Sequence, residues 1–292
     1  MLLHWFKSFF KDELWVFIHP QHMLFLRVSR SLNNGLKQKV EYQQVINFPQ
    51  TITNINNESQ DWQILSKYLK QALSHTKWQG TTPTVIVSNH FARYAVIPWN
   101  AELAVEAERL AYMQHCFNLV YGEVAKTWDL RMSEPEFGQP TIASAIKLSL
   151  LQALHDVFTE AGMALTAVNP QLTLAINQTL SEVKKQKKAL SFWLVAIQSE
   201  RVCLTLLING GWRLVKNVAI EADVSAQVTA LIQREIVNCS VHDEMPVLLY
   251  WPESKGKQAF TLENHKAIKV LPHQFEMQNS KASNSLPDWL LV

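Results

Sequence analysis

The sequence is poor in residues that several common protein chemistries require. Its 292 residues include only eight glycines and three cysteines. The cysteines are Cys116, Cys203 and Cys239, and no CxxC or Cys–His spacing joins them. This argues against a disulfide framework and against a zinc site built on cysteine. We expect three reduced, partly buried thiols.

An excess of charge of one sign and long apolar runs are also missing. Lys and Arg number 27 against 25 Asp and Glu, a net charge of +2, which lacks the basic footprint of a nucleic-acid-binding protein. The best apolar run, residues 190–197, is far shorter than the roughly 20 residues that cross a bilayer. Residues 1–12 lack a signal-peptide pattern because Lys7 and Lys11 interrupt the apolar residues. We therefore expect a soluble, cytoplasmic protein with no nucleic-acid partner.

Apolar residues, by contrast, are abundant, at 48% of the chain, enough for a sizeable core. The first quarter of the chain shows an ordered series of elements. The pattern predicts strands at 14–18, 23–29 and 40–48, a helix at 61–73 and a closing strand at 83–88. The helix is indicated by Trp62, Leu65, Leu69 and Leu73 at helical spacing.

The same order recurs later in the chain. Here the pattern predicts strands at 190–197, 202–208 and 212–220, a helix at 224–237 and a closing strand at 246–250. Asn209-Gly210-Gly211 supplies a strong hairpin turn between the second and third strands. The two stretches share the order β-β-β-α-β without shared identity. This repeat predicts a mixed α/β fold with two similar halves.

The material between the repeats predicts a small inserted α+β subdomain. A strand at 91–97 ends at Pro98, and a long helix follows at 102–121. We expect five parts: a leader at 1–12, a first half at 13–90 completed by 141–180, an inserted subdomain at 91–140, a second half at 189–275, and a flexible tail at 276–292.

Two β-β-β-α-β halves with an inserted module resemble the duplicated ribonuclease H-like fold of actin-like ATPases. The phrase SNHFARYAVIPW (88–99) is similar to the passage in PilM-type proteins that leaves the first sheet and leads to a proline and an acidic helix. The opening LLHWFKSFFKDELWVFI resembles the basic-aromatic leader of PilM relatives. The nearest groups are PilM, MshI and the cytoplasmic part of GspL, bacterial scaffolds of type IV pilus and type II secretion assembly.

The resemblance implies a partner and a place for it. The partner would be the cytoplasmic tail of an inner-membrane assembly protein, with an assembly ATPase as a second candidate, at the inner face of the inner membrane. In PilM-type proteins such a tail binds a groove between the first half and the extra subdomain. Carried over to this chain, the groove would involve Phe91, Arg93, Tyr94, Trp99, Arg109 and Tyr112.

The sequence lacks the residues with which this fold holds ATP. ATP-using members place an acidic residue and glycines at the hairpin after each first strand, for hydrated magnesium and for close approach of backbone N–H groups to phosphates. Here these hairpins read HPQH (19–22) and QSE (198–200). The adenosine-binding glycine pair is expected near Trp251, where Gly256 stands alone. We expect no nucleotide cofactor and no catalysis, with Glu200 an exposed turn residue.

Three other groupings favour structural over chemical roles. Ser88-Asn89-His90 has no visible acid partner, and His19 and His22 have no third metal ligand near them in sequence. The lysine run at 184–188 indicates a solvated connector.

The leader carries an apolar helical face. It is made by Leu2, Trp5, Phe6 and Phe9, with Lys7 and Lys11 beside it. Such a face docks on a membrane surface or in a partner groove, or packs on its own domain, and the sequence leaves these open.

These observations predict a non-catalytic cytoplasmic scaffold. A diverged ATPase or small-molecule kinase of the same fold is the first alternative. A filament-forming or cell-division interaction module is the second.

Overall fold

The computed structural model describes residues 11–31, 37–52, 58–103, 105–134, 136–186, 190–198, 200–221, 223–241, 245–252, 262, 267–270 and 276–277. The expected leader face, with Leu2, Trp5, Phe6 and Phe9, lies outside these residues, as does residue 256. The chain divides into two compact units. Unit 1 is Met1–Phe91, Leu148–Gln171 and His273–Val292, and unit 2 is Ala92–Lys147 and Leu172–Pro272.

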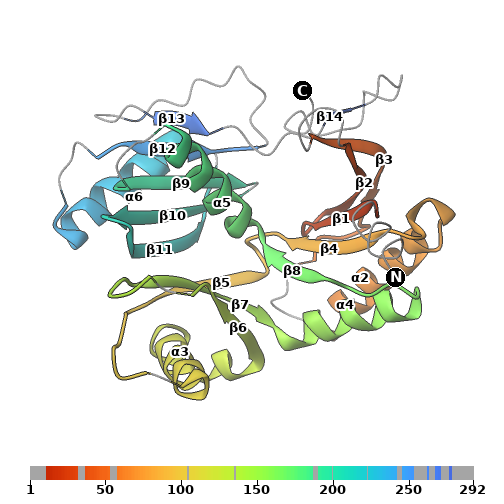
Figure 1. Ribbon diagram of the computed structural model, residues 1–292, viewed down its shortest axis with the longest axis horizontal. Helices are drawn as coiled ribbons and strands as arrows, with labels where there is room; N and C mark the ends of the chain where they lie inside the picture. The colour runs from red at the N-terminus through yellow and green to blue at the C-terminus, as the bar shows by residue number, and fades with distance from the viewer. Residues whose placement is uncertain are drawn as a thin grey trace, which may run out of the picture. The chain divides into compact units, whose positions relative to one another are not determined.

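Unit 1 is built on a six-stranded sheet in the order β14-β3-β2-β1-β4-β8 (Figure 1). The strands are β1 (Glu13–Ile18), β2 (His22–Ser31), β3 (Lys37–Asn47), β4 (Thr82–Val87), β8 (Ala167–Pro170) and β14 (Glu276–Met277). β1 pairs antiparallel with β2 and parallel with β4. Its Leu14, Val16 and Ile18 are buried, and the residues between them are half-buried, so β1 lies in the middle of the sheet with its stronger apolar face inward.

Two helices of unit 1 pack together beside this sheet (Figure 1). They are α2 (Glu58–Leu73) and α4 (Leu148–Glu160). The four residues predicted to line the inner face of the first helix, Trp62, Leu65, Leu69 and Leu73, are all buried. The indole Nε1 of Trp62 also donates to Ser149 Oγ at 3.0 Å, which joins the start of α4 to α2. A short 3-10 helix, η1 (Thr76–Trp78), leads into β4 and buries Trp78 completely.

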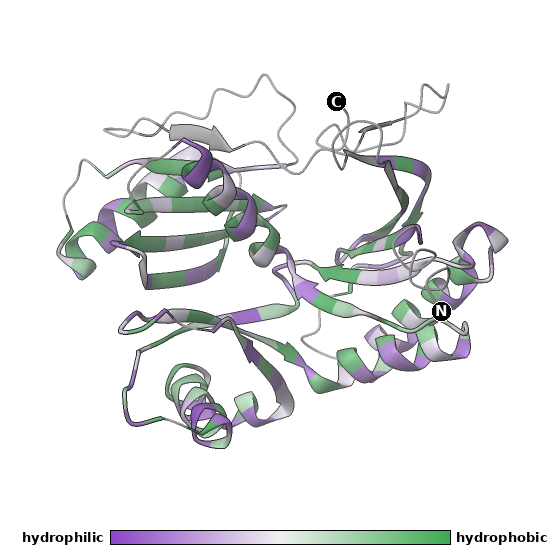
Figure 2. Ribbon diagram, in the orientation of Figure 1, coloured by the Kyte–Doolittle hydropathy of each residue, from purple (hydrophilic) through white to green (hydrophobic). Residues whose placement is uncertain are grey.

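The larger sheet of unit 2 has the order β11-β10-β9-β12-β13. Its strands are β9 (Phe192–Gln198), β10 (Arg201–Ile208), β11 (Gly211–Ala219), β12 (Val247–Tyr250) and β13 (Ala267–Val270). Every residue of β9 is buried, and Figure 2 shows that most residues of β9 and β10 are hydrophobic. The sheet is therefore covered on both faces.

Two helices provide that cover. α5 (Gln171–Lys185) begins directly after Pro170 and packs Leu172, Ala175 and Val183 on one core cluster. α6 (Val224–Cys239) packs on the other, with Val228, Leu231 and Ile232 inward. Asp223 caps α6, because its side chain accepts from Ala226 N–H at 3.0 Å.

A smaller sheet in unit 2 has the order β5-β7-β6, with β5 (Ala92–Ile97), β7 (Thr141–Lys147) and β6 (Trp128–Met132). Helix α3 (Glu106–Tyr121) covers it through Met113 and Phe117, and η2 (Glu123–Thr127) links α3 to β6. The sequence prediction grouped 141–180 with the first half. The structure places β7 in the small sheet because both its edges pair there, and it places α5 against the second sheet.

The two large sheets repeat one topology. The orders β3-β2-β1-β4-β8 and β11-β10-β9-β12-β13 correspond strand for strand, and each is mixed in the same way. The hairpins after β1 and β9 are closed alike. Phe48 N–H donates to Gln21 O at 2.8 Å, and Ile220 N–H donates to Glu200 O at 2.9 Å. The predicted duplicated α/β fold with an inserted α+β module is confirmed.

Candidate functional site

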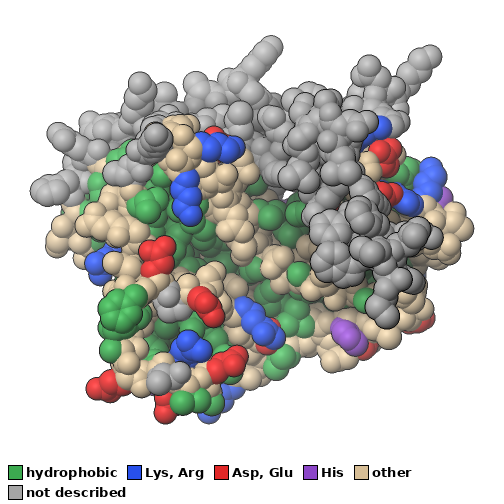
Figure 3. All heavy atoms as spheres, viewed as in Figure 1, with side chains coloured by type: hydrophobic (Ala, Val, Ile, Leu, Met, Phe, Trp, Pro, Cys, Tyr) green, Lys and Arg blue, Asp and Glu red, His purple; other side chains and the backbone are tan. Residues whose placement is uncertain are grey.

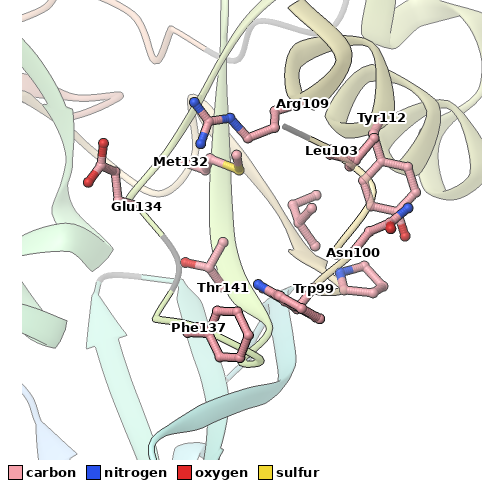
Figure 4. Close-up of a pocket in the computed structure, with 11 residues that line it drawn as sticks. Trp99, Asn100, Leu103, Arg109, Tyr112, Met132, Glu134, Phe137 and Thr141 are labelled. Carbon is pink, nitrogen blue, oxygen red and sulfur yellow. The ribbon is translucent and has the colours of Figure 1, made fainter. Parts of the chain in front are cut away.

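The small subdomain of unit 2 contains a pocket of about 280 Å³ (Figure 4). Its lining comes from the end of β5, the loop between β5 and α3, the first two turns of α3, the end of β6 and the loop into β7. The lining residues are Ile97, Pro98, Trp99, Asn100, Leu103, Arg109, Tyr112, Met132, Glu134, Phe137 and Thr141. A cavity of this size accommodates a few side chains and lies at the small end of ligand pockets.

The pocket has an aromatic end and a charged end. Trp99 and Phe137 meet edge to face with ring centroids 5.0 Å apart, and Phe137 is 90% exposed. In Figure 4 this pair lines one end, and Arg109 and Glu134 extend at the opposite end, with Met132 between them. Such a surface suits a peptide that inserts an apolar side chain at one end and a polar or charged group at the other.

Local sequence explains how these side chains are presented. Pro98 ends β5 because it lacks a backbone donor, so Trp99 leaves the sheet at the pocket mouth. Arg109 and Tyr112 lie three residues apart on α3 and so share one helix face. Burial, with Cys116 one turn on, raises the pKa of Tyr112 and keeps its phenol neutral.

Three of the six residues predicted to bind a partner meet in this pocket, namely Trp99, Arg109 and Tyr112. The other three do not line it. Phe91 is buried in unit 1 against Trp62, with ring centroids 6.1 Å apart. Tyr94 is buried in the core of unit 2, where burial raises its pKa well above the ordinary value.

Arg93 has a third environment. It is half-buried, and its Nη1 donates to the carbonyl of Ala92 at 2.9 Å. Arg93 and Tyr94 are neighbours on β5, so their side chains point to opposite faces of the strand, and neither lines the pocket.

Sequence reasoning missed the far wall of the pocket, above all Phe137. The signal was an aromatic residue in a short loop between strands, preceded by acidic residues and followed by Gly138. Gly138 has φ +76, a conformation that glycine adopts readily, and the turn it makes presents Phe137 to solvent.

In the hairpin after β1, the backbone N–H groups of residues 19–21 are either hydrogen-bonded within the hairpin or, at Pro20, missing. His19 N–H donates to His22 O at 2.9 Å, and Gln21 N–H donates to His19 Nδ1 at 3.4 Å. Pro20 has no N–H. The carbonyls of Pro20 and Gln21 are taken by the N–H groups of Ile52 and Phe48. In the second hairpin, Glu200 is exposed at φ 61 with its carbonyl bonded to Ile220, while residue 199 lies outside the described residues.

The fold brings a third histidine to the first hairpin. His90 follows β4, the parallel neighbour of β1, so it lies beside His19. The ring centroid of His19 lies 4.8 Å from that of His22 and 5.4 Å from that of His90. Ser88 Oγ lies 2.7 Å from His90 Nδ1. Among the residues that the structure describes, no group of three or more His, Cys, Asp or Glu has a geometry that holds a metal ion.

Charge is mixed on the face that Figure 3 shows. On the face in Figure 3, Lys and Arg side chains alternate with Asp and Glu and form no extended patch of one sign. From the lysine run, Lys185 ends α5 and pairs with Glu182 at 2.8 Å, and Lys184 lies in the last turn of the same helix. In the part of the chain that the structure covers, no helix has the length and apolar character required to cross a bilayer.

Neither a family model nor a curated protein matches this sequence. Solved structures match its fold. One is a chain of the PilM-PilN type IV pilus biogenesis complex, at 10% identity and TM-score 0.60, with 93% of this chain and 92% of that chain covered. Another is the cytoplasmic domain of EpsL, an inner membrane component of the Vibrio cholerae type II secretion system, at 8% identity and TM-score 0.51, covering 92% and 91%.

A third similar structure is a Bacteroides thetaiotaomicron protein of unknown function with an actin-like ATPase fold, at 10% identity and TM-score 0.52, covering 86% of each chain. These likenesses define the class of fold. The chain has an actin-like fold of the kind found in PilM-type proteins and in the EpsL cytoplasmic domain, and the resemblance drawn from the sequence is confirmed at that level.

Proposed function

We propose that this protein is a non-catalytic scaffold that binds a cytoplasmic segment of an inner-membrane protein in a pilus or secretion-type assembly. Its place would be the cytoplasm, at the inner face of the inner membrane. The observation that carries the proposal is the pocket of the small subdomain, with its aromatic pair of half-buried Trp99 and exposed Phe137. Two of the proteins similar in fold belong, by name, to such assemblies.

The chemistry of the pocket favours a peptide. Apolar surface patches with a polar rim mark interaction sites, and tryptophan, tyrosine and arginine are enriched in interface hot spots. Trp99 and Phe137 supply apolar contact area, and Arg109 offers a charged donor. A short segment that anchors one apolar residue against the ring pair and places an acidic or amide group near Arg109 would satisfy both ends.

The hydrogen bonding within the hairpin after β1 supports a non-catalytic role. Its His19 and Gln21 N–H groups are bonded within the hairpin, and Pro20 offers none. A triphosphate would have to break these bonds to find donors there. This arrangement favours a scaffold over a diverged ATPase or kinase.

The direct test is a titration with a synthetic peptide. Its sequence is a cytoplasmic segment chosen from the single-pass inner-membrane proteins of the same organism, with one apolar residue and one acidic residue. We expect Trp99→Ala and Phe137→Ala to weaken binding about tenfold or more, since truncated hot-spot residues cost more than about 1.4 kcal/mol. Val237→Ala, an exposed apolar residue on α6, is the matched control and should bind as the wild type does. Unchanged affinity in both pocket variants would refute the pocket as the site.

A second titration addresses catalysis. Mg-ATP should show no binding tighter than about 100 μM, which corresponds to about −5.5 kcal/mol. Tighter binding would favour the enzyme alternative. The peptide titration tests the pocket independently of this result.

A further inference from the structure

The small sheet of unit 2, in the order β5-β7-β6, has two edges, and side chains occupy one of them. At the edge formed by β5, the Tyr121 hydroxyl group bonds the backbone O and N–H of Tyr94 at 2.8 and 3.3 Å. On the same strand, Asn217 Nδ2 donates to the backbone O of Ala92 at 3.3 Å. A further strand would have to displace these bonds in order to pair with β5.

The opposite edge is formed by β6. Among the described strands β6 pairs only with β7, in an antiparallel register over its five residues, Trp128–Met132. In such a pair, every second residue directs its N–H and C=O away from the neighbouring strand. Trp128 is one of these, because its N–H donates to Ala125 O in η2 and not to β7. Alternation then directs the backbone groups of Leu130 and Met132 outward as well.

The outward backbone groups of β6 are open. Among the residues that the structure describes, no hydrogen bond reaches the backbone of Leu130 or Met132 from outside the ladder of β6 and β7. One side-chain bond does reach this strand, from Ser144 Oγ to Arg131 O at 3.5 Å, and Ser144 belongs to β7 itself. Unpaired backbone groups on an edge strand are a template for a further strand. β6 therefore presents free donors and acceptors to an extended segment.

The two faces of β6 differ in character. Leu130 and Met132 are half-buried at the rim of the core cluster under α3. Asp129 and Arg131 face the other way, since neighbouring residues of a strand alternate, and they pair at 2.8 Å with the Arg131 side chain 80% exposed. An added strand would meet apolar side chains on one face and two opposite charges on the other, and cross-strand contacts of both kinds stabilise strand pairing.

The open edge leads into the pocket of the small subdomain. Met132 ends β6 and lines the pocket, and Glu134 lines it two residues later. Figure 4 shows Met132 between the charged end, where Arg109 and Glu134 extend, and the aromatic end. An extended segment beside β6 would therefore reach the pocket with its next residues.

We propose that the partner segment binds as an extended strand added to the open edge of β6, with its next residues in the pocket. This inference rests on the proposed function, peptide binding at the pocket, and defines the chemistry of the partner. The paired part would alternate apolar residues, which cover Leu130 and Met132, with polar residues beside Asp129 and Arg131, and it would lack proline. Backbone hydrogen bonds would supply affinity, and the pocket would select the side chain that enters it.

The test uses the full chain and the synthetic peptide of the pocket titration, N-methylated at one backbone nitrogen at a time. In an added strand, every second N–H of the peptide points to β6. N-methylation should therefore weaken binding about five- to tenfold at alternate positions of the paired part. The positions between them are the matched controls, and N-methylation there should have little effect.

Amide hydrogen exchange in the protein gives a second measurement. With free peptide at about ten times its dissociation constant, the N–H groups of Leu130 and Met132 should exchange about tenfold more slowly, because the bound state protects them. The N–H groups of Val228 and Ile232 on α6 should exchange at their original rates.

Alternating sensitivity to N-methylation, together with slower exchange at Leu130 and Met132, supports the added strand. The absence of either result overturns it. If Trp99→Ala nevertheless weakens binding of the unmodified peptide, the peptide occupies the pocket without pairing with β6, and the proposed function is unaffected. If the unmodified peptide does not bind at all, this inference and the peptide site at the pocket are both refuted.

Discussion

The hydroxyl group of Tyr121, at the end of α3, donates to the backbone carbonyl of Tyr94 at 2.8 Å and accepts from its N–H at 3.3 Å. β5 is an edge strand of the small sheet, and an edge strand presents backbone groups without a strand partner. One phenol thus satisfies both groups of Tyr94 and anchors α3 to the sheet edge.

Tyr121→Phe should therefore destabilise the protein by about 1–2 kcal/mol, because it leaves two backbone groups to find other partners. Urea unfolding measures this. Tyr68→Phe, on α2 with its ring against Phe48, is the matched control and is expected to change stability by less. Equal effects of the two substitutions would show that the Tyr121 hydroxyl does not anchor the edge.

His19 makes unit 1 sensitive to acid. Burial, followed by the charges of His22 and His90, lowers the pKa of His19 to about 3. The unfolded chain, with a His pKa near about 6.5, then binds more protons than the folded chain between these values. This contribution to stability is complete above about pH 6.5 and is lost as the pH falls toward 3, by about 2 kcal/mol between pH 7 and pH 5.

His19→Asn should remove most of that loss, because an amide keeps an acceptor for Gln21 N–H and does not titrate in this range. Unfolding free energies at pH 7 and pH 5 test this. His155→Asn, at an exposed position of α4, should retain the wild-type pH dependence. If His19→Asn retains it too, the acid sensitivity has another source.

Glu235 of α6 is a nearly buried carboxylate held by three donors. Its side chain is 2% exposed, and it accepts from Lys216 at 2.7 Å, Arg234 at 2.9 Å and Asn238 at 3.2 Å. Burial favours the protonated form, but these hydrogen bonds outweigh it and lower the pKa of Glu235. Its stabilising effect is therefore present above its ordinary pKa and is lost as the pH falls through the lowered one.

Glu235→Gln should cost about 2–3 kcal/mol at pH 7, since it leaves Lys216 without its charged partner. Glu182→Gln removes the partner of Lys185 on α5, at the surface, and should cost less than about 1 kcal/mol. Chemical unfolding of both variants gives the comparison. Similar losses would show that burial does not strengthen the Glu235 network.

Alanine substitutions at Phe117 and Phe137 distinguish an effect on stability from an effect on peptide binding. Phe117 is completely buried on α3, whereas Phe137 is 90% exposed at the pocket. Phe117→Ala should lower the free energy of unfolding by about 3–5 kcal/mol, and Phe137→Ala should change it by less than about 0.5 kcal/mol. Thermal melts measure both. A large loss in Phe137→Ala would mean that this side chain supports the loop, and its effect on peptide binding would then need a different interpretation.

The order of elements was readable from the amino-acid sequence because both halves encode it in local patterns. In α2, the spacing of Trp62, Leu65, Leu69 and Leu73 follows the helical period, and all four are buried. The strand runs that became β1 and β9 are short, apolar and rich in β-branched and aromatic residues. Patterns of this kind depend only on near neighbours, so periodicity reveals them.

Which residues meet was decided by tertiary structure. Parallel pairing of β1 with β4 brings His90 to His19, across 71 positions of sequence that no local pattern connects. The same holds for Trp99 and Phe137. Tyr94 lies within β5 and is buried, whereas Trp99 follows Pro98, beyond the end of β5, and lines the pocket. The sequence by itself determined the helices, the strands and their repeat. Long-range pairing alone decided which residues form each site, because a binding surface is made by side chains that different strands and helices bring together.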